Sequence, residues 1–288
     1  MRSIRFWSLA LVVLLALLQS LPRTSAAQGW GGTVRAGTIR FTDSTSVGAL
    51  SGVIEYKPLG WLELGAAPTL VRSTTGSSTA SGVGDLPLSV AASTQWGTPL
   101  HPELGAGILF TLPTGQAACG LGSGQTAVGM NLAAGISPTE VVHLSADASR
   151  SFSGAITLSS LDQPQATWVD LGGDVDLAPR WTLSLSVGGD LGGADTVTAD
   201  REIGGGVGYA FGNALNLAVD VTHRLAGLAP RWGVTVSFGT AATALSPLNS
   251  LSPLARQRQV FVSGSGNRGH GNSRGGSGGG GSTVTTCP

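Results

Sequence analysis

Three residues with the side chains of a hydrolytic centre occupy alternate positions near the middle of the chain: His143, Ser145 and Asp147. In an extended strand, residues i, i+2 and i+4 point to the same side, so an imidazole, a hydroxyl and a carboxylate would line one face. A histidine next to a serine can activate the hydroxyl as a nucleophile. The same spacing also suits a strand face that is lined with solvated polar groups, so its meaning depends on where that face points.

Three aspartates form a second candidate group, because Asp170, Asp174 and Asp176 share one face of a later strand. At about 3.3 Å per residue they lie roughly 7 to 13 Å apart, so a divalent cation would need further ligands from neighbouring strands. A solvated acidic stripe is therefore favoured, and no metal or cofactor is expected. The Gly-rich segment 120–124 lacks the Lys-Ser or Lys-Thr of a phosphate-binding loop, and we expect an ordinary loop there.

Both groups lie in a region where apolar and polar residues alternate with the period of β-strands. Most candidate strands are 9 to 12 residues long, the length that a tilted strand needs to cross a bilayer. They cover residues 30–41, 49–57, 61–71, 84–96, 103–112, 126–136, 141–152, 167–178, 181–191, 202–211, 214–225 and 231–238. Short turns alternate with longer loops at 42–48, 72–83, 113–125, 153–166, 192–201 and 226–230. This alternation is typical of outer-membrane barrels, whose periplasmic turns are short.

The aromatic residues also indicate a membrane protein. All six Trp, five Phe and two Tyr between residues 30 and 239 lie near strand ends, where a transmembrane barrel has its two interfacial girdles. The girdle beside the short turns would contain Trp30, Tyr56, Trp61, Trp96, Trp181, Tyr209, Phe211 and Phe238, and the girdle beside the long loops Phe41, Phe110, Phe152, Trp168 and Trp232. The sequence predicts an all-β fold, an antiparallel up-and-down transmembrane β-barrel of about 12 strands, with a secreted β-sandwich as the alternative.

The two ends of the chain differ from the strand region. Arg2 and Arg5 precede an apolar run and a small-residue cleavage motif, so residues 1–27 are expected to be a cleaved signal peptide. Residues 28–240 would form the barrel, and residues 241–288, which are rich in Ser and Gly, a flexible C-terminal tail. In this topology Cys119 and Cys287 lie on opposite sides of the membrane, so a disulfide between them is not favoured.

Strand alternation assigns a set of polar side chains to the barrel interior. The candidate lumen-lining residues are Glu55, Lys57, Glu63, His143, Ser145, Asp147, Asp170, Asp174, Asp176, Asp190, Asp220 and Arg224. Acids outnumber bases, so a water-filled lumen would mildly prefer cations. A narrow or gated pore and an interior filled by side chains are equally compatible with about 12 strands. The zero net charge offers no basic stripe for nucleic acid.

Two stretches of the strand region resemble a known family. Gly82-Val83-Gly84-Asp85 opens one strand, Leu112-Pro113-Thr114-Gly115 ends the next, and Gly122-Ser123-Gly124 follows in the loop. In this order they are similar to the outer-membrane, transporter-like barrels of the MetA-pathway of phenol degradation family, over about residues 30–239. Gln116 and Gln125 stand where acidic residues are common in that family. The resemblance implies passage of small, often hydrophobic, compounds across the outer membrane.

These observations predict a channel or transporter-like β-barrel of the bacterial outer membrane, without enzymatic activity, whose loops 73–81, 113–125 and 153–165 gate a polar lumen. Expected partners are outer-membrane lipid, the barrel-assembly machinery and a small-molecule solute. A structural or surface-interaction barrel with a filled lumen is one alternative, and an outer-membrane lipid hydrolase another. The hydrolase is disfavoured, because Val142, Leu144 and Ala146 take the lipid-facing side and leave His143 and Ser145 in the lumen.

Overall fold

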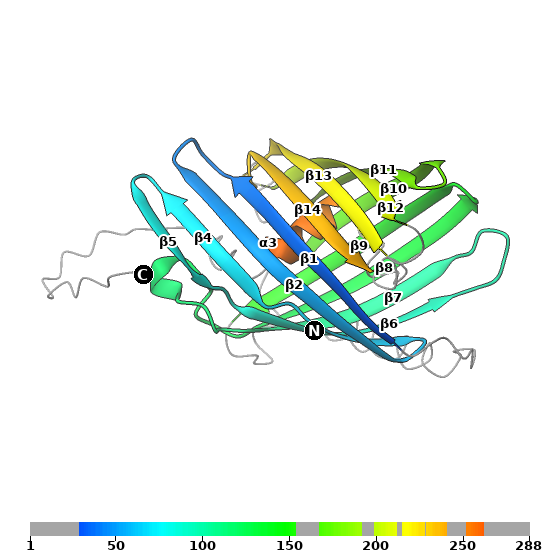
Figure 1. Ribbon diagram of the computed structural model, residues 1–288, viewed down its shortest axis with the longest axis horizontal. Coiled ribbons are helices and arrows are strands. Elements are labelled where there is room, and N and C mark those ends of the chain that lie inside the picture. The colour runs from blue at the N-terminus through cyan, green and yellow to red at the C-terminus, as the bar shows by residue number, and fades with distance from the viewer. Residues whose placement is uncertain are drawn as a thin grey trace, which may run out of the picture.

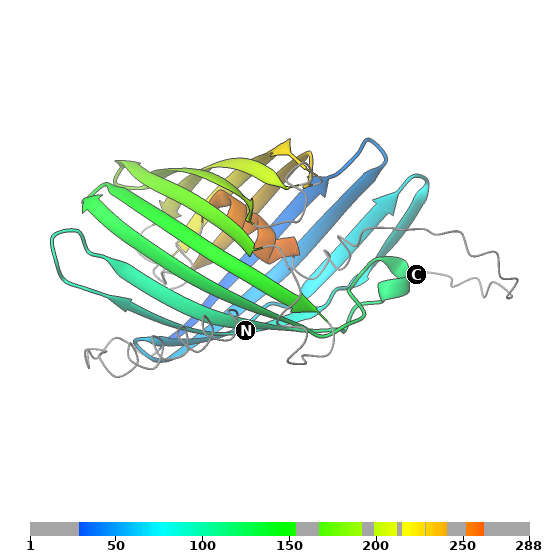
Figure 2. The same ribbon diagram turned by 180° about the vertical axis from the view of Figure 1, so that it is seen from behind.

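The computed structural model describes residues 29–153, 167–191, 199–211, 215–227, 229–240 and 252–261. The expected signal peptide, most of the expected tail and the loop 154–166 lie outside these residues and stay predictions. Within the described ranges, one antiparallel sheet runs around a closed barrel (Figures 1 and 2). The predicted fold class is therefore confirmed.

The barrel closes where its first strand, β1 (Gly29–Arg40), pairs in antiparallel fashion with its last, β14 (Trp232–Thr240). On its other side β1 pairs along its whole length with β2 (Thr45–Leu59). The remaining strands are β3 (Leu62–Ala66), β4 (Thr69–Thr75), β5 (Ser78–Val83), β6 (Leu86–Gln95), β7 (Glu103–Leu112), β8 (Ala127–Thr139), β9 (Val142–Ser153), β10 (Thr167–Ala178), β11 (Trp181–Leu191), β12 (Arg201–Phe211) and β13 (Leu215–Ala226).

Two strands of the wall are interrupted, which is why fourteen strand segments form a twelve-stranded barrel. β3 and β4 both pair with β2 and are separated by Ala67 and Pro68, while β5 and β6 are separated by Gly84 and Asp85. Proline has no backbone N–H to give to a ladder. Pro68 therefore takes part in the ladder only through its carbonyl oxygen, which accepts a hydrogen bond from the Gly52 N–H at 3.0 Å.

The predicted long loop over residues 72–83 is wrong. β4 continues to Thr75 and β5 begins at Ser78, so this segment is a hairpin with a tight turn at Gly76, whose φ is +61°. That backbone conformation is open to glycine at little cost. The β-branched residues Thr74 and Thr79 face each other across the hairpin, with 3.3 Å between their hydroxyl oxygens. Residues 73–81 are thus part of the wall rather than an irregular gating loop.

The outer face of the wall is apolar and the inner face polar, as strand alternation predicts. On β10, Leu171 is 55% exposed while its neighbour Asp170 is 2% exposed, and on β13 the same contrast separates Val221 from Asp220. Leu, Val and Ile dominate the exposed apolar side chains around the barrel. A surface of this kind is stable against lipid tails and unstable against water.

A girdle of contacting rings lies at the end of the barrel that carries the short turns. Trp30 and Tyr56 have ring centroids 4.7 Å apart, and Tyr209 lies 4.7 Å from Trp181 and 4.8 Å from Phe211. These residues come from β1, β2, β11 and β12, near the ends of each strand. The rings therefore mark one membrane interface.

The girdle predicted at the opposite end is only partly correct. Trp168 is 5% exposed and shares the inner face with Asp170, two residues further along β10. Phe41 packs against a cluster of inward-facing apolar residues. Phe110 is 41% exposed on the outer face, as expected, and the side chain of Phe152 lies outside the described residues. Trp168 was misassigned because position near a strand end was weighed above its strand parity.

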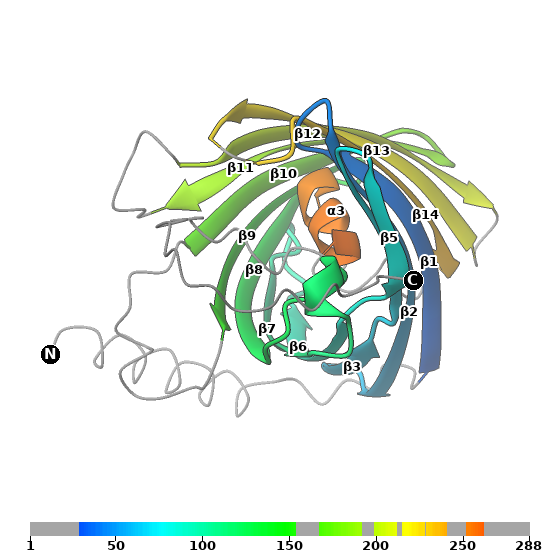
Figure 3. The same cartoon turned by 90° about the vertical axis from the view of Figure 1, so that its left-hand side faces the viewer.

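A short helix, α3 (Pro253–Phe261), lies inside the barrel, and Figure 3 shows it within the ring of strands. Ser252 caps the helix, since its hydroxyl accepts a hydrogen bond from the Ala255 N–H at 3.1 Å. Pro253 occupies the first helical turn, where its missing N–H costs nothing. The expectation of a flexible tail is therefore wrong for residues 252–261. None of the described helices is long and apolar enough to cross a membrane.

Replacing Leu171 with arginine should destabilise the membrane-inserted barrel by about 2–4 kcal/mol, because a charge on the lipid face is most costly near the bilayer midplane. Leu171 lies mid-strand on β10, and the matched control is Leu177→Arg on the same strand and face, close to the short turn. Near the interface the cost falls to about 0–1 kcal/mol. Unfolding in urea from lipid vesicles would measure both, and equal effects would contradict the assigned lipid face.

Candidate functional site in the barrel lumen

The inner wall is shaped to hold α3, because glycines occupy inward positions where the helix comes closest. A Cβ added at Gly204 on β12 would lie 3.0 Å from a side-chain carbon of Pro253, and one at Gly233 on β14 would lie 2.6 Å from the Gln257 amide nitrogen. At Gly37 on β1 it would meet the Phe261 ring at 3.2 Å. Larger side chains at these positions would collide with the helix, so the wall and α3 fit each other.

Arg256 attaches α3 to the wall through an ion pair with Asp220. Its Nε and Nη2 donate to the two carboxylate oxygens of Asp220 at 2.8 and 2.7 Å, a bidentate arrangement. The Asp220 side chain is completely buried, and Asp174 and Asp170 add to the attraction on the guanidinium. Because the Asp220 side chain is completely buried and the Arg256 side chain is only 16% exposed, each charge depends mainly on the other for stabilisation.

Arg258 makes the second cationic contact of the helix. Its guanidinium carbon lies 3.0 Å from the ring centroid of Trp168, which is a cation–π geometry. The carboxylates of Asp147 and Asp170, opposite each other on β9 and β10, also attract it. Inward Trp168 is therefore part of the lumen site, and not an interfacial anchor.

Neutral hydrogen bonds complete the contact between α3 and the wall. The Leu254 N–H donates to the Ser186 hydroxyl of β11 at 3.3 Å, and the Thr222 hydroxyl of β13 donates to the Gln257 side-chain oxygen. The first turn of a helix has backbone N–H groups without helical partners, so the contact from Leu254 satisfies one of them. Polar contacts thus hold the helix on several strands at once.

The C-terminal end of α3 is apolar and packs where the lumen meets the long loops. Val260 is fully buried and Phe261 is 5% exposed. They form one cluster with Ile39, Val47, Ala49, Val71 and Ala80 of the wall and with Leu121 of the loop after β7. The loop and the helix therefore share a core at this end of the lumen.

The family-motif residues Gly84, Asp85, Thr114, Gly115 and Gly122 meet in one clamp, which fixes the loop 113–125. Asp85 is 1% exposed, and its carboxylate accepts hydrogen bonds from the Gly115 N–H at 3.0 Å and from the Ser123 N–H and hydroxyl at 2.6 and 2.7 Å. The Thr114 hydroxyl donates to the Gly84 carbonyl at 2.7 Å. A Cβ at Gly122 would collide with the Asp85 carboxylate.

The other motif glycines have related steric roles. A Cβ at Gly82 would lie 2.9 Å from Leu121, so its absence leaves room for the loop to pack on β5. Gly124 has φ +68°, in the left-handed region that favours glycine. Pro113 follows β7 directly and is exposed. The family motif therefore has a structural role, which is to hold the loop 113–125 in place. This role was not predicted from the sequence.

The predicted lumen-lining residues share the inward strand faces, with different degrees of burial. Glu55, Asp170 and Asp220 are buried, and Asp176 is exposed near the short-turn end, where it accepts a 2.7 Å hydrogen bond from Thr182. Partly buried are Lys57, Glu63, His143, Ser145, Asp147, Asp174, Asp190 and Arg224. Lys57 and Glu63 form an ion pair of 3.2 Å, and Arg224 donates to the Ala229 carbonyl at 3.1 Å.

The hydrolytic arrangement is not assembled in the described part of the chain. His143 Nδ1 lies 3.1 Å from the Ser137 hydroxyl, beyond the β8–β9 turn, and no hydrogen bond between His143 and Ser145 is present among the described residues. Across the strands, Ser145 is opposite Gly172 and His143 is opposite Asp174. The described residues also contain no group of three or more His, Cys, Asp or Glu that could hold a metal.

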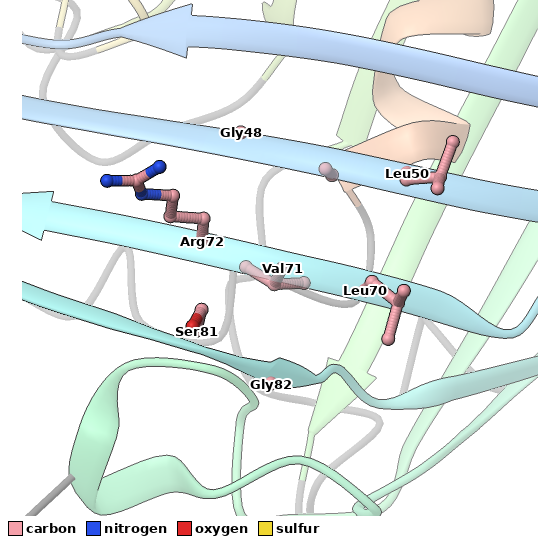
Figure 4. A pocket seen from close by; sticks show the side chains of 8 residues that line it. Gly48, Leu50, Leu70, Val71, Arg72, Ser81 and Gly82 are labelled. Carbon is pink, nitrogen blue, oxygen red and sulfur yellow. The ribbon is translucent and has the colours of Figure 1, made fainter. Parts of the chain in front are cut away.

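Cys119 is disulfide-bonded, although the sequence did not favour this. It belongs to the short 3-10 helix η1 (Ala117–Cys119) in the clamped loop and packs against the cluster that contains Phe261. Its partner lies outside the described residues. Away from the lumen, Figure 4 shows a shallow hollow beside Gly48, Leu50, Leu70 and Arg72. Leu50 and Leu70 are exposed on the outer face, so this hollow is not part of the lumen.

Sequence reasoning missed α3 and with it Arg256, Arg258 and the inward role of Trp168. A usable signal was present, because Ser252 followed by Pro253 is a typical helix start. The helix has only nine residues and lies between segments rich in Ser and Gly. The burial of the helix depends on a lumen that exists only once the barrel has closed. No local sequence pattern could therefore indicate that the helix lies inside the barrel.

The closed wall, its apolar outer face, its ring girdle and its polar interior define an outer-membrane β-barrel, surrounded by lipid. A family model described as "Putative MetA-pathway of phenol degradation" matches residues 23–240, and the chain belongs to that family. The matched residues end with β14, so α3 lies beyond them.

Solved structures share this fold. An outer membrane channel from Pseudomonas putida F1 is 17% identical, with a TM-score of 0.59 over 76% of this chain and 97% of that one. The KdgM porin in complex with disordered oligogalacturonate is 10% identical, with a TM-score of 0.50 over 73% and 98% of the two chains. At such identities the likeness shows the fold alone. No curated protein matches the chain.

Proposed function

We propose that this protein is a channel for small molecules in the bacterial outer membrane, and that α3 closes its lumen in the state described here. The observation that carries the proposal is the small size of the side chains that face the interior. The inward residues of β10 to β14 are mainly Gly, Ser, Thr and Asp, which leave room for a helix. A helix with its side chains is about 10 Å across, so a passage of similar width would exist without it.

The nature of the filling also supports a channel. Small barrels are commonly filled by side chains of their own strands. Here the outer part of the lumen is filled by a separate segment, held by an ion pair, a cation–π contact, hydrogen bonds and the apolar packing of Val260 and Phe261. The polar contacts in this set can be exchanged for contacts with water or solute. Diffusion through the lumen requires no covalent chemistry, and barrel-assembly machinery would insert the barrel.

Liposomes containing the full-length protein should swell in small neutral sugars but not in dextrans wider than about 10 Å, the width of the helix that the lumen holds. Swelling should be slow, because α3 occupies the lumen in most molecules. Liposomes with heat-denatured protein provide the control. A structural barrel with a permanently filled lumen is the competing function, and it would show no swelling with any solute, even in variants designed to detach α3.

A further inference from the structure

One side of the lumen carries a concentration of carboxylates from five adjacent strands. The carboxylates face inward from adjacent strands β9 to β13: Asp147, Asp170, Asp174, Asp190, Glu202 and Asp220. Arg224 is a cation of the same strands and donates to the Ala229 carbonyl near the loop end. We call these six carboxylates the acidic sector. Arg256 and Arg258 of α3 bring two positive charges against it.

The acidic sector binds those arginines with the geometry of a planar-cation site. Asp220 accepts two hydrogen bonds from the edge of the Arg256 guanidinium, and the Trp168 ring stacks on the face of the Arg258 guanidinium. Bidentate carboxylates and aromatic faces are the groups that proteins use for planar cations. Arg35 of β1, which is separated from β13 only by β14, repels Arg256 and is attracted by Glu55 and Asp220. Asp220 therefore attracts an arginine of the wall as well as Arg256 of the helix.

Two buried polar atoms in this site have no hydrogen-bond partner among the described residues, although the Ser252 hydroxyl before α3 donates to the Asp170 carboxylate. Asp170 is 2% exposed, and its Oδ2 has no hydrogen-bond partner among the described residues. Trp168 is 5% exposed, and its Nε1–H likewise has none. Buried polar groups normally have partners, and a missing one indicates a ligand or a functional role. The helix therefore satisfies the acidic sector incompletely.

We infer that the acidic sector with Trp168 is a binding site for organic cations that carry a planar guanidinium or amidinium group on an apolar body, and that α3 is a tethered occupant of this site. The inference rests on the proposed passage of solute through the lumen and names the class of solute. A cation of this type takes the place of Arg256 or Arg258, and its binding detaches α3. Solute and helix exclude each other, so the channel opens to the solute that it recognises.

Hydrogen exchange of the full-length protein in detergent, read by mass spectrometry on peptides covering residues 253–261, tests this competition. Benzamidine is the probe, and neutral benzamide, which has nearly the same shape, is the matched control. Benzamidine should raise exchange in α3 in a saturable manner, while benzamide and sodium chloride of equal ionic strength should not. Exchange in β6 and β7 should stay constant, which shows that the wall remains folded.

The variant Trp168→Leu provides a second measurement. Removing the aromatic face weakens the contact with Arg258 as well as the contact with benzamidine, so exchange in α3 should rise before any addition, and the further rise that benzamidine causes should shrink severalfold. Equal responses to benzamidine and benzamide, no response at all, or full exchange of wild-type α3 before any addition would each overturn the inference. Exchange reports site occupancy without passage, so a barrel that is silent in swelling assays but responds to benzamidine would contradict the channel and leave the cation site supported.

Discussion

Replacing Asp220 with asparagine is expected to detach α3 from the lumen and to increase the conductance of the barrel. The carboxylate accepts from both Nε and Nη2 of Arg256, and an asparagine would turn one of these acceptors into a donor that faces another donor. The arginine would remain as a buried charge with half of its pairing lost. Breaking a buried pair in this way costs about 3–5 kcal/mol.

That cost falls mainly on the docking of α3, because Asp220 lies in a wall strand whose ladders to β12 and β14 do not involve its side chain. A loss of about 3 kcal/mol lowers the docking equilibrium constant by roughly two orders of magnitude. In planar bilayers the full-length variant should therefore spend a much larger fraction of time open than the wild type. Faster exchange of residues 253–261 should accompany this change.

Asp43→Asn is the matched control, because it makes the same chemical change in an exposed ion pair. Asp43 lies between β1 and β2, its side chain is 87% exposed, and it contacts Arg40 and Arg231 at 3.5 and 3.6 Å. Exposed pairs contribute about 0–1 kcal/mol, so this variant should behave as wild type. An Asp220→Asn variant with wild-type conductance and a protected α3 would show that the ion pair does not hold the helix.

The predicted and observed structures agree wherever a residue's environment follows from its own strand. The parity that places Leu171 outside and Asp170 inside is a local property, and β7, β10 and β11 have the bounds read from the sequence. Disagreement arises where partners are distant in sequence. The side chain that covers the inward-facing Trp168 belongs to Arg258, ninety residues later, and residues 73–81 are ordered because β4 pairs with β2 on one side and with β5 on the other.

The motif glycines and Asp85 illustrate the same limit at the site. Their order along the chain was sufficient to recognise the family, but not to show that Asp85 would receive three hydrogen bonds from a loop thirty or more residues later. Those contacts tie the loop to the wall, and the cluster of Leu121, Val260 and Phe261 ties it to α3. The loop 113–125 and α3 are therefore in contact at the outer end of the lumen.

Asp85→Ala is expected to release the loop 113–125 and to loosen the far end of α3. The substitution leaves the partly buried N–H groups of Gly115 and Ser123 without their acceptor, and hydrogen bonds to a charged group contribute about 1.5–3 kcal/mol each. Leu121 would then leave the cluster that covers Phe261. Hydrogen exchange should rise strongly over 113–125 and moderately at residues 260–261, with little change in β10 and β11.

Ser123→Ala is the milder variant for comparison with Asp85→Ala. It removes only the Ser123 hydroxyl and leaves the backbone N–H hydrogen-bonded to Asp85. Its cost should be about 1 kcal/mol, with the loop still in place. If the clamp acts as a unit, Asp85→Ala should exceed Ser123→Ala severalfold in loop exchange, and the change at residues 260–261 should follow the same order. Similar effects of the two substitutions would mean that the disulfide at Cys119, rather than the carboxylate, fixes the loop.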